Sequence, residues 1–304
     1  MNILIIGIGN IGKRHLQSLS KLPFKVNFYL YDIKKYKISL SNNKHKIYIL
    51  DNLPKKINFE AAIIATTSID RYKLLKKIIS ENNIRKIILE KIAFLTKRQY
   101  LNSLKINNLL INYPRPLMKS YVNIKKYLKY KEIIGLSVYG NNWNMLSNTP
   151  HFMNLFLFIT NSNLSKIDSI KIHNRKYLSK RSNFHEIKGR VLFTNEKFQY
   201  LELLDSIKNK RSFIKIITRT GIIEINESSS NIIFIDHDNK TKIKKTFKLE
   251  YQSDLTHKVL FNSEFKKRIK FLFLDKCIHH ELLYIDFINI LKKSNKLFSN
   301  IIYS

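Results

Sequence analysis

Three of the seven glycines in this 304-residue chain lie close together near its start, at Gly7, Gly9 and Gly12. They follow a continuous apolar run typical of a buried strand, and they open a segment with helical periodicity. In such a unit the first glycine allows a tight turn, the second lets the backbone approach a pyrophosphate, and the third lets helix and strand pack closely. The N–H groups of Asn10 and Ile11, at the start of the helix, would face the same anion. This pattern predicts a dinucleotide-binding site.

A carboxylate follows at the distance that such a site requires. Asp32 lies 20 residues after Gly12, at the expected end of a second strand. A carboxylate there accepts hydrogen bonds from the ribose hydroxyls of adenosine and repels a 2′-phosphate, so it favours NAD. Lys34 and Lys35 follow at once and leave NADP open. The alternative is a plain glycine turn with a surface aspartate.

The elements that would position these residues alternate between strands and helices over the first part of the chain. Strands are expected over residues 2–6, 26–31, 46–50, 60–65, 86–89 and 109–113, with helices after Gly12 and over 70–81. Strands that alternate with helices through short connections predict a doubly wound parallel sheet, and therefore an α/β Rossmann fold.

Pro114 and Pro116 mark the point where this alternation stops. Beyond them we expect a helix over 118–129, a strand over 132–139, a helix over 150–160, successive strands from 166 to 248, and helices near 254–292. Thr149 would cap the 150–160 helix, with Pro150 at its first position. The closely spaced strands predict a large, mostly antiparallel sheet. We therefore predict a dinucleotide-binding Rossmann domain over 1–115, and an α+β domain over 116–304 for substrate binding and oligomerisation.

The composition excludes several classes of protein. With 44% hydrophobic and 25% charged residues, the chain has the composition of a globular protein rather than a disordered one. Its single cysteine, Cys277, excludes an internal disulfide and a cysteine cluster for a metal, so a reducing cytoplasm is the simplest location. No signal peptide or membrane span is expected, because the apolar run at the start is short and is broken by glycines.

The formal charge of +33 suggests a polyanionic partner, but the kind of basic residue argues against one. The 55 basic residues are 44 lysines and 11 arginines, whereas phosphate-clamping and base-reading surfaces favour the planar fork of arginine. The chain also holds only four alanines and is rich in isoleucine and asparagine, as an AT-rich genome produces. We interpret the charge as mostly compositional and expect no nucleic-acid partner, although an anionic small substrate would still be attracted.

Four motifs occur in a characteristic order along the chain. They are Gly7-Ile8-Gly9-Asn10-Ile11-Gly12 with Arg14-His15 behind it, Ala65-Thr66-Thr67, Glu90-Lys91-Ile92, and His151 at the opening of an apolar helix. Together they resemble the Gfo/Idh/MocA family of two-domain NAD(P)-dependent sugar oxidoreductases, over essentially the whole chain. The resemblance implies that Thr66, Thr67, Glu90 and Lys91 belong to the cofactor site. The chain departs from the family pattern at Thr67, Arg71, Ile92, Ser147 and Asn154, where the family has proline, histidine, proline and often two aspartates.

The same resemblance assigns the chemistry to two residues. Lys91 would end a buried strand at the cofactor edge of the sheet, where its ammonium can hold a substrate hydroxyl and stabilise the alkoxide that forms as hydride leaves. His151, expected in the first turn of its helix, would stay neutral beside the positive end of the dipole and act as the base. Asn148 would orient a sugar hydroxyl. The alternatives are that Lys91 is one lysine among many and that His151 is a packed helix residue.

Other residues have weaker claims to the site. The resemblance implies that Tyr113 and Arg115 lie beside the nicotinamide and the substrate, although the flanking prolines also suit a plain hinge. Trp143 lies in a stretch that looks like family members encoded with surface-polysaccharide genes, and it is a further substrate candidate.

Near the C-terminus, Cys277, His280 and Glu281 share helical spacing. We interpret them as one face of a helix rather than as metal ligands, because no further cluster of ligands accompanies them. No metal is expected.

The sequence therefore predicts an NAD(P)-dependent oxidoreductase that moves hydride between nicotinamide and a hydroxyl or keto carbon of a sugar or nucleotide-linked sugar. By family resemblance it would form a dimer or a dimer of dimers. The alternative is a family member that has kept the cofactor site, lost catalysis, and serves as a cofactor- or sugar-sensing binding protein. The departures at Thr67, Ile92 and Ser147 motivate that alternative.

Overall fold

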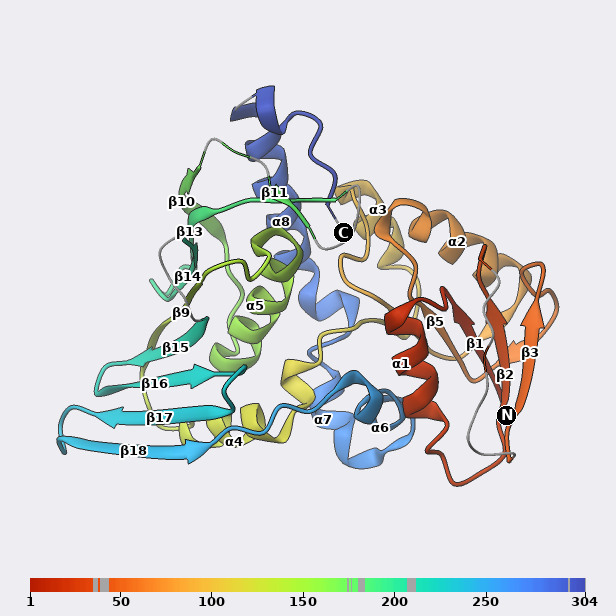
Figure 1. Ribbon diagram of the computed structural model, residues 1–304, viewed down its shortest axis with the longest axis horizontal. Helices are drawn as coiled ribbons and strands as arrows, with labels where there is room; N and C mark the ends of the chain where they lie inside the picture. Colours follow the sequence, from red (N-terminus) through yellow and green to blue (C-terminus); the bar gives the residue numbers. More distant parts are fainter. Residues whose placement is uncertain are drawn as a thin grey trace. The chain divides into compact units, whose positions relative to one another are not determined.

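The computed structural model describes residues 1–34, 38, 44–173, 175, 177–179, 184–206, 212–294 and 296–303. Lys35, one of the two lysines expected to influence the choice of cofactor, lies outside these residues. Two compact units divide the chain, the first made of residues 1–117 and 250–276 and the second of residues 118–249 and 277–304 (Figure 1). The first passage between units falls close to the expected boundary after residue 115, whereas residues 250–276, expected in the second domain, pack in the first unit.

The first unit is built on a six-stranded parallel sheet in the order β3-β2-β1-β5-β7-β8. Its strands are β1 (Asn2–Ile6), β2 (Asn27–Tyr31), β3 (Lys46–Leu50), β5 (Ala61–Ile64), β7 (Ile87–Leu89) and β8 (Leu109–Ile111). Every side chain of β5 and β7 is buried, as expected for a parallel sheet covered on both faces. The strand order changes direction between β1 and β5, which is the doubly wound arrangement, so the Rossmann prediction is confirmed.

The helices α1 (Asn10–Leu19), α2 (Ser68–Glu81) and α3 (Lys97–Ser103) connect these strands. The first two were predicted, but α3 was not, because seven residues with two buried side chains carry little periodic signal. Its local signal is the cap, since Thr96 Oγ1 accepts a hydrogen bond from Gln99 N at 3.3 Å. Two short strands, β4 (Asn58–Phe59) and β6 (Asn83–Ile84), form a separate parallel pair.

Residues 250–276 return to the first unit as a series of short helices. These are η2 (Gln252–Asp254), α6 (Thr256–Phe261), η3 (Ser263–Phe265) and α7 (Lys266–Ile269). The segment pairs with the edge of the parallel sheet, because Ile111 N donates to Leu272 O at 2.8 Å and Phe273 forms a bridge with Leu110.

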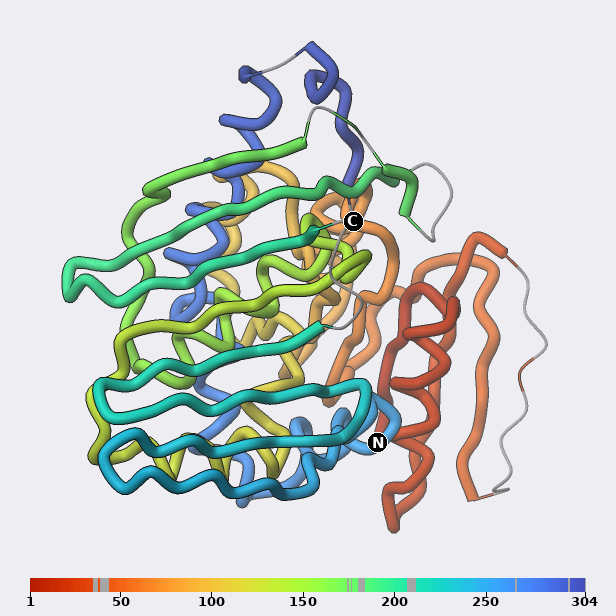
Figure 2. Tube along the Cα trace, turned by 60° about the vertical axis from the view of Figure 1, so that its left-hand side comes forward, coloured from red at the N-terminus to blue at the C-terminus, as the bar shows by residue number. Residues whose placement is uncertain are grey.

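The second unit contains an eight-stranded sheet in the order β10-β13-β14-β9-β15-β16-β17-β18 (Figure 2). Its strands are β9 (Ile133–Gly140), β10 (Lys166–Ile172), β13 (Gly189–Thr194), β14 (Tyr200–Asp205), β15 (Phe213–Thr218), β16 (Gly221–Asn226), β17 (Asn231–Asp236) and β18 (Thr241–Thr246). All neighbours pair antiparallel except β9 with β14. The prediction of a large, mostly antiparallel sheet is confirmed.

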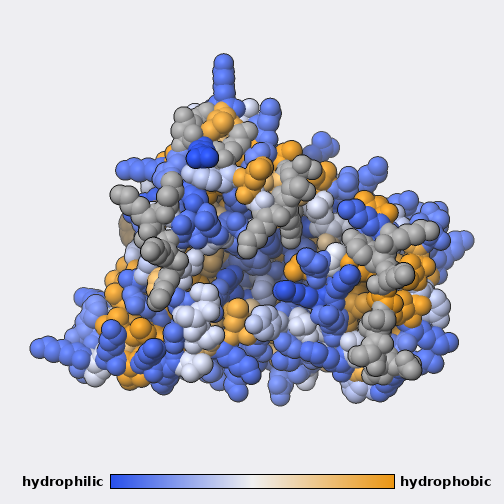
Figure 3. Space-filling model, in the orientation of Figure 1, coloured by the Kyte–Doolittle hydropathy of each residue, from blue (hydrophilic) through white to orange (hydrophobic). Residues whose placement is uncertain are grey.

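Helices cover one face of this sheet. They include α5 (Met145–Thr160) and α8 (Leu274–Ser294), and the ring of Phe193 on β13 meets that of Phe287 on α8 at 5.9 Å. Figure 2 looks onto the other face, and Figure 3 shows hydrophobic side chains among hydrophilic ones over β15–β18. The remaining elements are η1 (Arg115–Leu117) in the first unit, and α4 (Lys119–Tyr127), β11 (Tyr177–Leu178), β12 (His185–Glu186) and η4 (Lys296–Phe298) in the second.

The start of α5 differs from the prediction. The helix begins at Met145 rather than at Pro150, so Thr149 is not its N-cap and His151 is not in its first turn. The carboxylate of Glu186 explains the earlier start, because it accepts hydrogen bonds from the first-turn N–H groups at 146 (2.7 Å) and 147 (3.3 Å).

Pro150 is therefore inside the helix, where it has no N–H to donate to Leu146 O. The hydroxyl of Tyr284 on α8 donates to that oxygen at 2.9 Å instead. A partner from another helix thus replaces the hydrogen bond that proline removes.

No helix in the described residues has the length and apolarity needed to cross a membrane.

Candidate functional site

The glycine turn joins β1 to α1, and two of its glycines are required by the protein itself. Gly7 has a φ of +88°, and a Cβ there would lie 2.7 Å from Thr66 N. A Cβ on Gly12 would lie 1.9 Å from Gly7 O, so helix and turn approach too closely for any side chain. The sequence predicted both roles from the spacing.

Gly9 is different from these two. Its backbone is extended, with φ −68° and ψ −167°, and no described atom beyond its neighbours in the chain lies within 4 Å of the position that its Cβ would take. The fold alone therefore does not need a glycine at this position. A group that occupies the open side of the turn would need one, and a pyrophosphate beside the start of α1 fits that requirement.

Asp32 stands at the end of β2 beside this turn. One carboxylate oxygen accepts a hydrogen bond from Ile8 N at 2.6 Å, and the other accepts one from Lys34 N at 2.9 Å. A cavity of about 540 Å³ opens there, and its lining includes Ile8, Asp32, Lys34, Leu50 and Asp51. Two backbone donors thus fix the carboxylate at the edge of a space large enough for an adenosine group.

These observations fit a dinucleotide in the first unit. Asn10 and Ile11 form the first turn of α1, where N–H groups have no acceptor within the helix. The open side of Gly9 adjoins them, and Asp32 lies at the cavity edge. When bound, a nicotinamide dinucleotide supplies a carbon that accepts or donates hydride.

Glu90 and Lys91 follow β7 at the same edge of the sheet. Lys91 is half-buried, and its peptide bond to Ile92 is cis. The Glu90 carboxylate binds His15 Nε2 at 3.0 Å and accepts a hydrogen bond from Asn112 Nδ2. Burial favours a higher pKa for this carboxyl, but the hydrogen bonds of His15 and Asn112 and the charges of His15 and Arg71 lower the pKa below its usual value. Glu90 is therefore ionised at neutral pH and supports the loop that carries Lys91.

Thr66 and Thr67 join β5 to α2, and Thr67 is the N-cap residue of that helix. From the sequence, Arg71 was recognised only as a departure from the family pattern. It is 1% exposed, and its guanidinium donates to backbone oxygens of Thr66, Glu90 and Ile92. Two loops at the candidate cofactor edge therefore share one buried cation.

Tyr113 and Arg115 lie just after β8, and their positions do not test the roles expected for them. Tyr113 is 1% exposed, and Arg115 begins the short helix η1. Their expected contacts with nicotinamide and substrate stay a prediction.

The remaining predicted substrate residues lie together in the second unit. Trp143 lies in the turn between β9 and α5, where its indole N–H donates to Leu204 O at 3.0 Å and its ring meets that of Phe152 edge to face. Asn148 donates its side-chain N–H to Trp143 O at 2.6 Å. His151 is half-buried one turn further along α5. Trp143 thus lies in the turn before α5, and Asn148 and His151 lie in the first two turns of that helix.

Sequence reasoning missed the charged residues that support this turn. Asp205 accepts a hydrogen bond from Asn142 N at 2.9 Å, and Lys188 donates to the side chain of Asn141 at 2.8 Å. Burial raises the pKa of the Asp205 carboxyl, and the hydrogen bond from Asn142 and the charge of Lys188 offset part of that rise. The period-two pattern of β14 carried a signal, because it places Asp205 on the buried face with Leu201 and Leu203.

Glu186 had no such signal in the sequence. Its carboxylate accepts hydrogen bonds from the hydroxyl of Ser147 and from the first-turn N–H groups of α5. Ser147 is the position at which the family often has an aspartate. A carboxylate therefore does lie at this point, but it comes from a strand of only two residues elsewhere in the chain.

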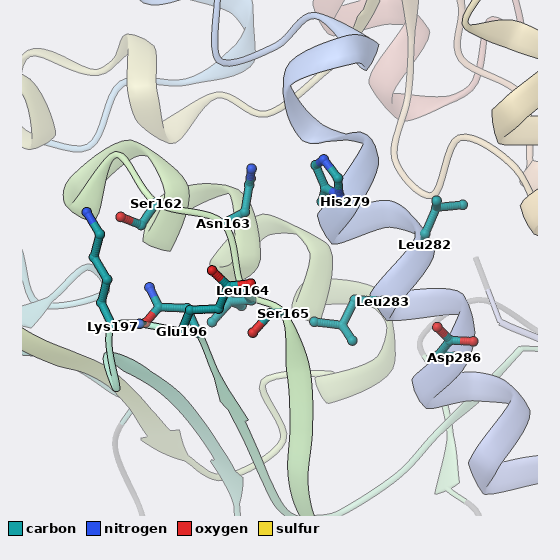
Figure 4. Close-up of a pocket in the computed structure, with 11 residues that line it drawn as sticks. Ser162, Asn163, Leu164, Ser165, Glu196, Lys197, His279, Leu282, Leu283 and Asp286 are labelled. Atoms are coloured by element: carbon teal, nitrogen blue, oxygen red, sulfur yellow. The ribbon is translucent and has the colours of Figure 1, made fainter.

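A second cavity, of about 530 Å³, lies in the second unit beyond the other end of α5 (Figure 4). Its lining comes from the α5–β10 loop, the β13–β14 turn and α8, and includes Ser165, Glu196, His279 and Asp286. Cys277, His280 and Glu281 are buried in α8. His280 Nε2 accepts a hydrogen bond from Leu164 N at 2.9 Å, and burial, with the nearby charge of His279, lowers the pKa of its ring to about 3.

The sequence matches no family model and no curated protein. Among solved structures, the fold is similar to a Gfo/Idh/MocA family oxidoreductase from Vibrio cholerae (TM-score 0.65, 11% identity, covering 97% of this chain and 99% of that one). It is also similar to the UDP-N-acetylglucosamine 3-dehydrogenase GnnA from Acidithiobacillus ferrooxidans (TM-score 0.62, 8% identity, 95% and 96% covered). A third similar structure is the transcriptional regulator Gal80p from Kluyveromyces lactis (TM-score 0.64, 16% identity, 94% and 90% covered). At these identities the similarity establishes the fold, and at that level the resemblance expected from the four motifs is confirmed.

Proposed function

We propose that this chain, which has the fold of the Gfo/Idh/MocA oxidoreductases, is an NAD(P)-dependent oxidoreductase acting on a hydroxyl or keto carbon. The observation that carries the proposal is the open side of Gly9 next to the first turn of α1, with Asp32 held at the edge of the adjoining cavity. Gly7 and Gly12 have structural reasons for being glycine, whereas the space beside Gly9 is explained by a ligand.

We propose NAD as the preferred cofactor. Gly7, Gly9, Asn10, Ile11 and Gly12 would surround its pyrophosphate, as in other glycine-rich turns of this kind. The Asp32 carboxylate would accept hydrogen bonds from the ribose hydroxyls and oppose a 2′-phosphate. Thr66, Thr67 and Glu90 would complete the cofactor site at the ends of β5 and β7.

We assign the chemical steps to two residues, Lys91 in the first unit and His151 in the second. The ammonium of Lys91 would bind the reacting substrate oxygen and stabilise the negative charge that develops on it. The imidazole of His151 would take the hydroxyl proton during oxidation and return it during reduction. Tyr113, Arg115, Trp143 and Asn148 would position the substrate.

We propose a sugar or nucleotide-linked sugar as the substrate, in the synthesis of a surface polysaccharide in the cytoplasm. The similar dehydrogenase GnnA acts on UDP-N-acetylglucosamine by its name, and the excess of lysine would favour an anionic substrate. A dimer or dimer of dimers would cover the outer face of the eight-stranded sheet, where Ile222, Ile233 and Ile235 are half-buried.

The test is a screen of sugars and nucleotide sugars against NAD(H) and NADP(H), followed by the absorbance of reduced nicotinamide. We expect turnover with NAD(H), and a large loss in Lys91→Ala and His151→Asn. Unchanged turnover in both variants would overturn the assigned roles. Affinity for DNA or RNA that falls steeply with salt, with no NADH binding, would overturn the oxidoreductase itself. Sedimentation as a monomer at micromolar concentration would overturn the dimer.

The alternative is a binding protein that keeps the cofactor site without catalysis. Gal80p, a transcriptional regulator, has a similar fold, and this chain departs from the family pattern at Thr67, Ile92 and Ser147. NADH binding with no turnover across the whole screen would favour this alternative.

A further inference from the structure

Arg71 has the burial and the contacts of a residue that holds other groups in place. Its side chain is 1% exposed, and it lies in the first part of α2. A buried guanidinium is costly unless its N–H groups find acceptors, and here backbone oxygens accept hydrogen bonds from both Nη1 and Nη2. Nη1 donates to the oxygens of Glu90 and Ile92, and Nη2 donates to that of Thr66.

Nη1 also lies 3.5 Å from Ala93 O, but its two shorter hydrogen bonds go to the residues on either side of Lys91. Glu90 O and Ile92 O therefore share one donor, which fixes the backbone from which the Lys91 side chain projects. The third acceptor, Thr66 O, belongs to the loop after β5, whose backbone lies against Gly7. One planar cation thus joins the loop between β5 and α2 to the loop of Lys91, a geometry that the point charge of a lysine does not reproduce.

We infer that Arg71 is the positioning residue for Lys91, acting by binding the backbone oxygens of Glu90, Ile92 and Thr66. The side chain of Glu90 is held separately by His15 and Asn112, so the backbone and the side chain beside Lys91 are each fixed by their own partners. The inference rests on the proposed function for its kinetic consequence, but not for its structural one.

The experiment compares Arg71→Lys and Arg71→Met with a matched control, Lys86→Met. Lys86 directly precedes β7, in the same unit, and its ammonium donates to Leu260 O at 2.6 Å, so the control also removes a cation bound to a backbone oxygen. Hydrogen–deuterium exchange of the ligand-free protein is measured for peptides covering 89–95 and, separately, 2–12. NADH affinity, kcat, KM and the thermal midpoint are measured for the same variants.

We expect Arg71→Met to speed exchange in 89–95 about tenfold and to leave exchange in 2–12 unchanged. With a turned-over substrate, we expect kcat to fall about 100-fold in Arg71→Met and about tenfold in Arg71→Lys, with KM and NADH affinity within about threefold of wild type. Lys86→Met should change the thermal midpoint but neither kcat nor exchange in 89–95. The split between kcat and NADH affinity separates positioning from a general loss of structure.

Two results would overturn the inference. One is unchanged exchange in 89–95 in Arg71→Met. The other is faster exchange across the whole unit together with a parallel loss of NADH affinity, because that would make Arg71 a general stabilising residue. A wild-type protein that binds no NADH would count against the proposed function, and the exchange measurements would still decide the role of Arg71.

Discussion

Replacing Gly9 by alanine separates a requirement of the fold from a requirement of the ligand. The backbone at this position is one that alanine adopts without strain, and no described atom beyond its neighbours in the chain lies within 4 Å of the added Cβ. Alanine is a poorer N-cap than glycine by up to about 1 kcal/mol, but it lowers the entropy of the unfolded chain by a comparable amount. We therefore expect the free energy of unfolding to change by less than about 1 kcal/mol.

The cofactor should respond differently, because the new methyl group would occupy the space assigned to the pyrophosphate. We expect Gly9→Ala to weaken NADH binding by about 10- to 100-fold, or roughly 1.4–2.8 kcal/mol. Gly12→Ala is the matched control, since its Cβ would lie 1.9 Å from Gly7 O. That overlap with the backbone should cost about 3 kcal/mol of stability, whether or not a ligand is present.

The assay is a fluorescence titration with NADH, paired with urea unfolding of the ligand-free proteins. A Gly9→Ala protein that binds NADH as tightly as wild type would refute the assignment of this space to the cofactor. A Gly9→Ala protein that unfolds as easily as Gly12→Ala would show that the space is not open in the folded chain.

Three further predictions concern charged and buried groups. Because burial lowers the pKa of His280 to about 3, protons bind the unfolded chain preferentially, and stability should fall by about 1.4 kcal/mol per unit as pH drops below about 6.5. Urea unfolding at pH 7 and 4.5 should show a smaller loss in His280→Gln, and equal losses would contradict the neutral buried ring. Glu186→Ala should lower the free energy of unfolding by about 2–4 kcal/mol, and Glu186→Gln by less, because the amide keeps an acceptor for the first turn of α5; equal thermal midpoints would disprove the cap. Asp32→Ala should raise NADPH affinity relative to NADH about tenfold in a titration, and an unchanged ratio would remove Asp32 from the discrimination.

The first half of the fold was predictable because its signals are local. The spacing of Gly7, Gly9 and Gly12, with Asp32 at the end of the next strand, predicts a strand, a turn and a helix from neighbouring residues alone. Apolar runs such as β1 and β5 are buried on both faces, and this burial makes them recognisable as parallel strands.

The start of α5 was not predictable for the opposite reason. Thr149 and Pro150 are a sound local signal for the beginning of a helix. Two distant residues override it, because Glu186 satisfies an earlier first turn and Tyr284 supplies the hydrogen bond that Pro150 cannot. No pattern around residue 150 contains either partner.

Arg71 illustrates what resemblance leaves out. Comparison with the family pattern marks it as a departure, and a departure suggests lost function. Its hydrogen bonds to the backbone on either side of Lys91 suggest the reverse. A histidine side chain has fewer N–H donors than a guanidinium, so it would not make the same set of hydrogen bonds.

The return of residues 250–276 to the first unit decides how the gene for this protein can be cut. The chain passes between the two units after residues 117, 249 and 276, so no continuous fragment contains the whole Rossmann unit and nothing else. A fragment ending at 117 would leave the β8 edge without its pairing to Leu272 and Phe273, and His15 without Thr256 Oγ1, which lies 2.8 Å from its Nδ1. An exchange of cofactor units between relatives must therefore transfer two segments, or join them with a linker that replaces the entire second unit.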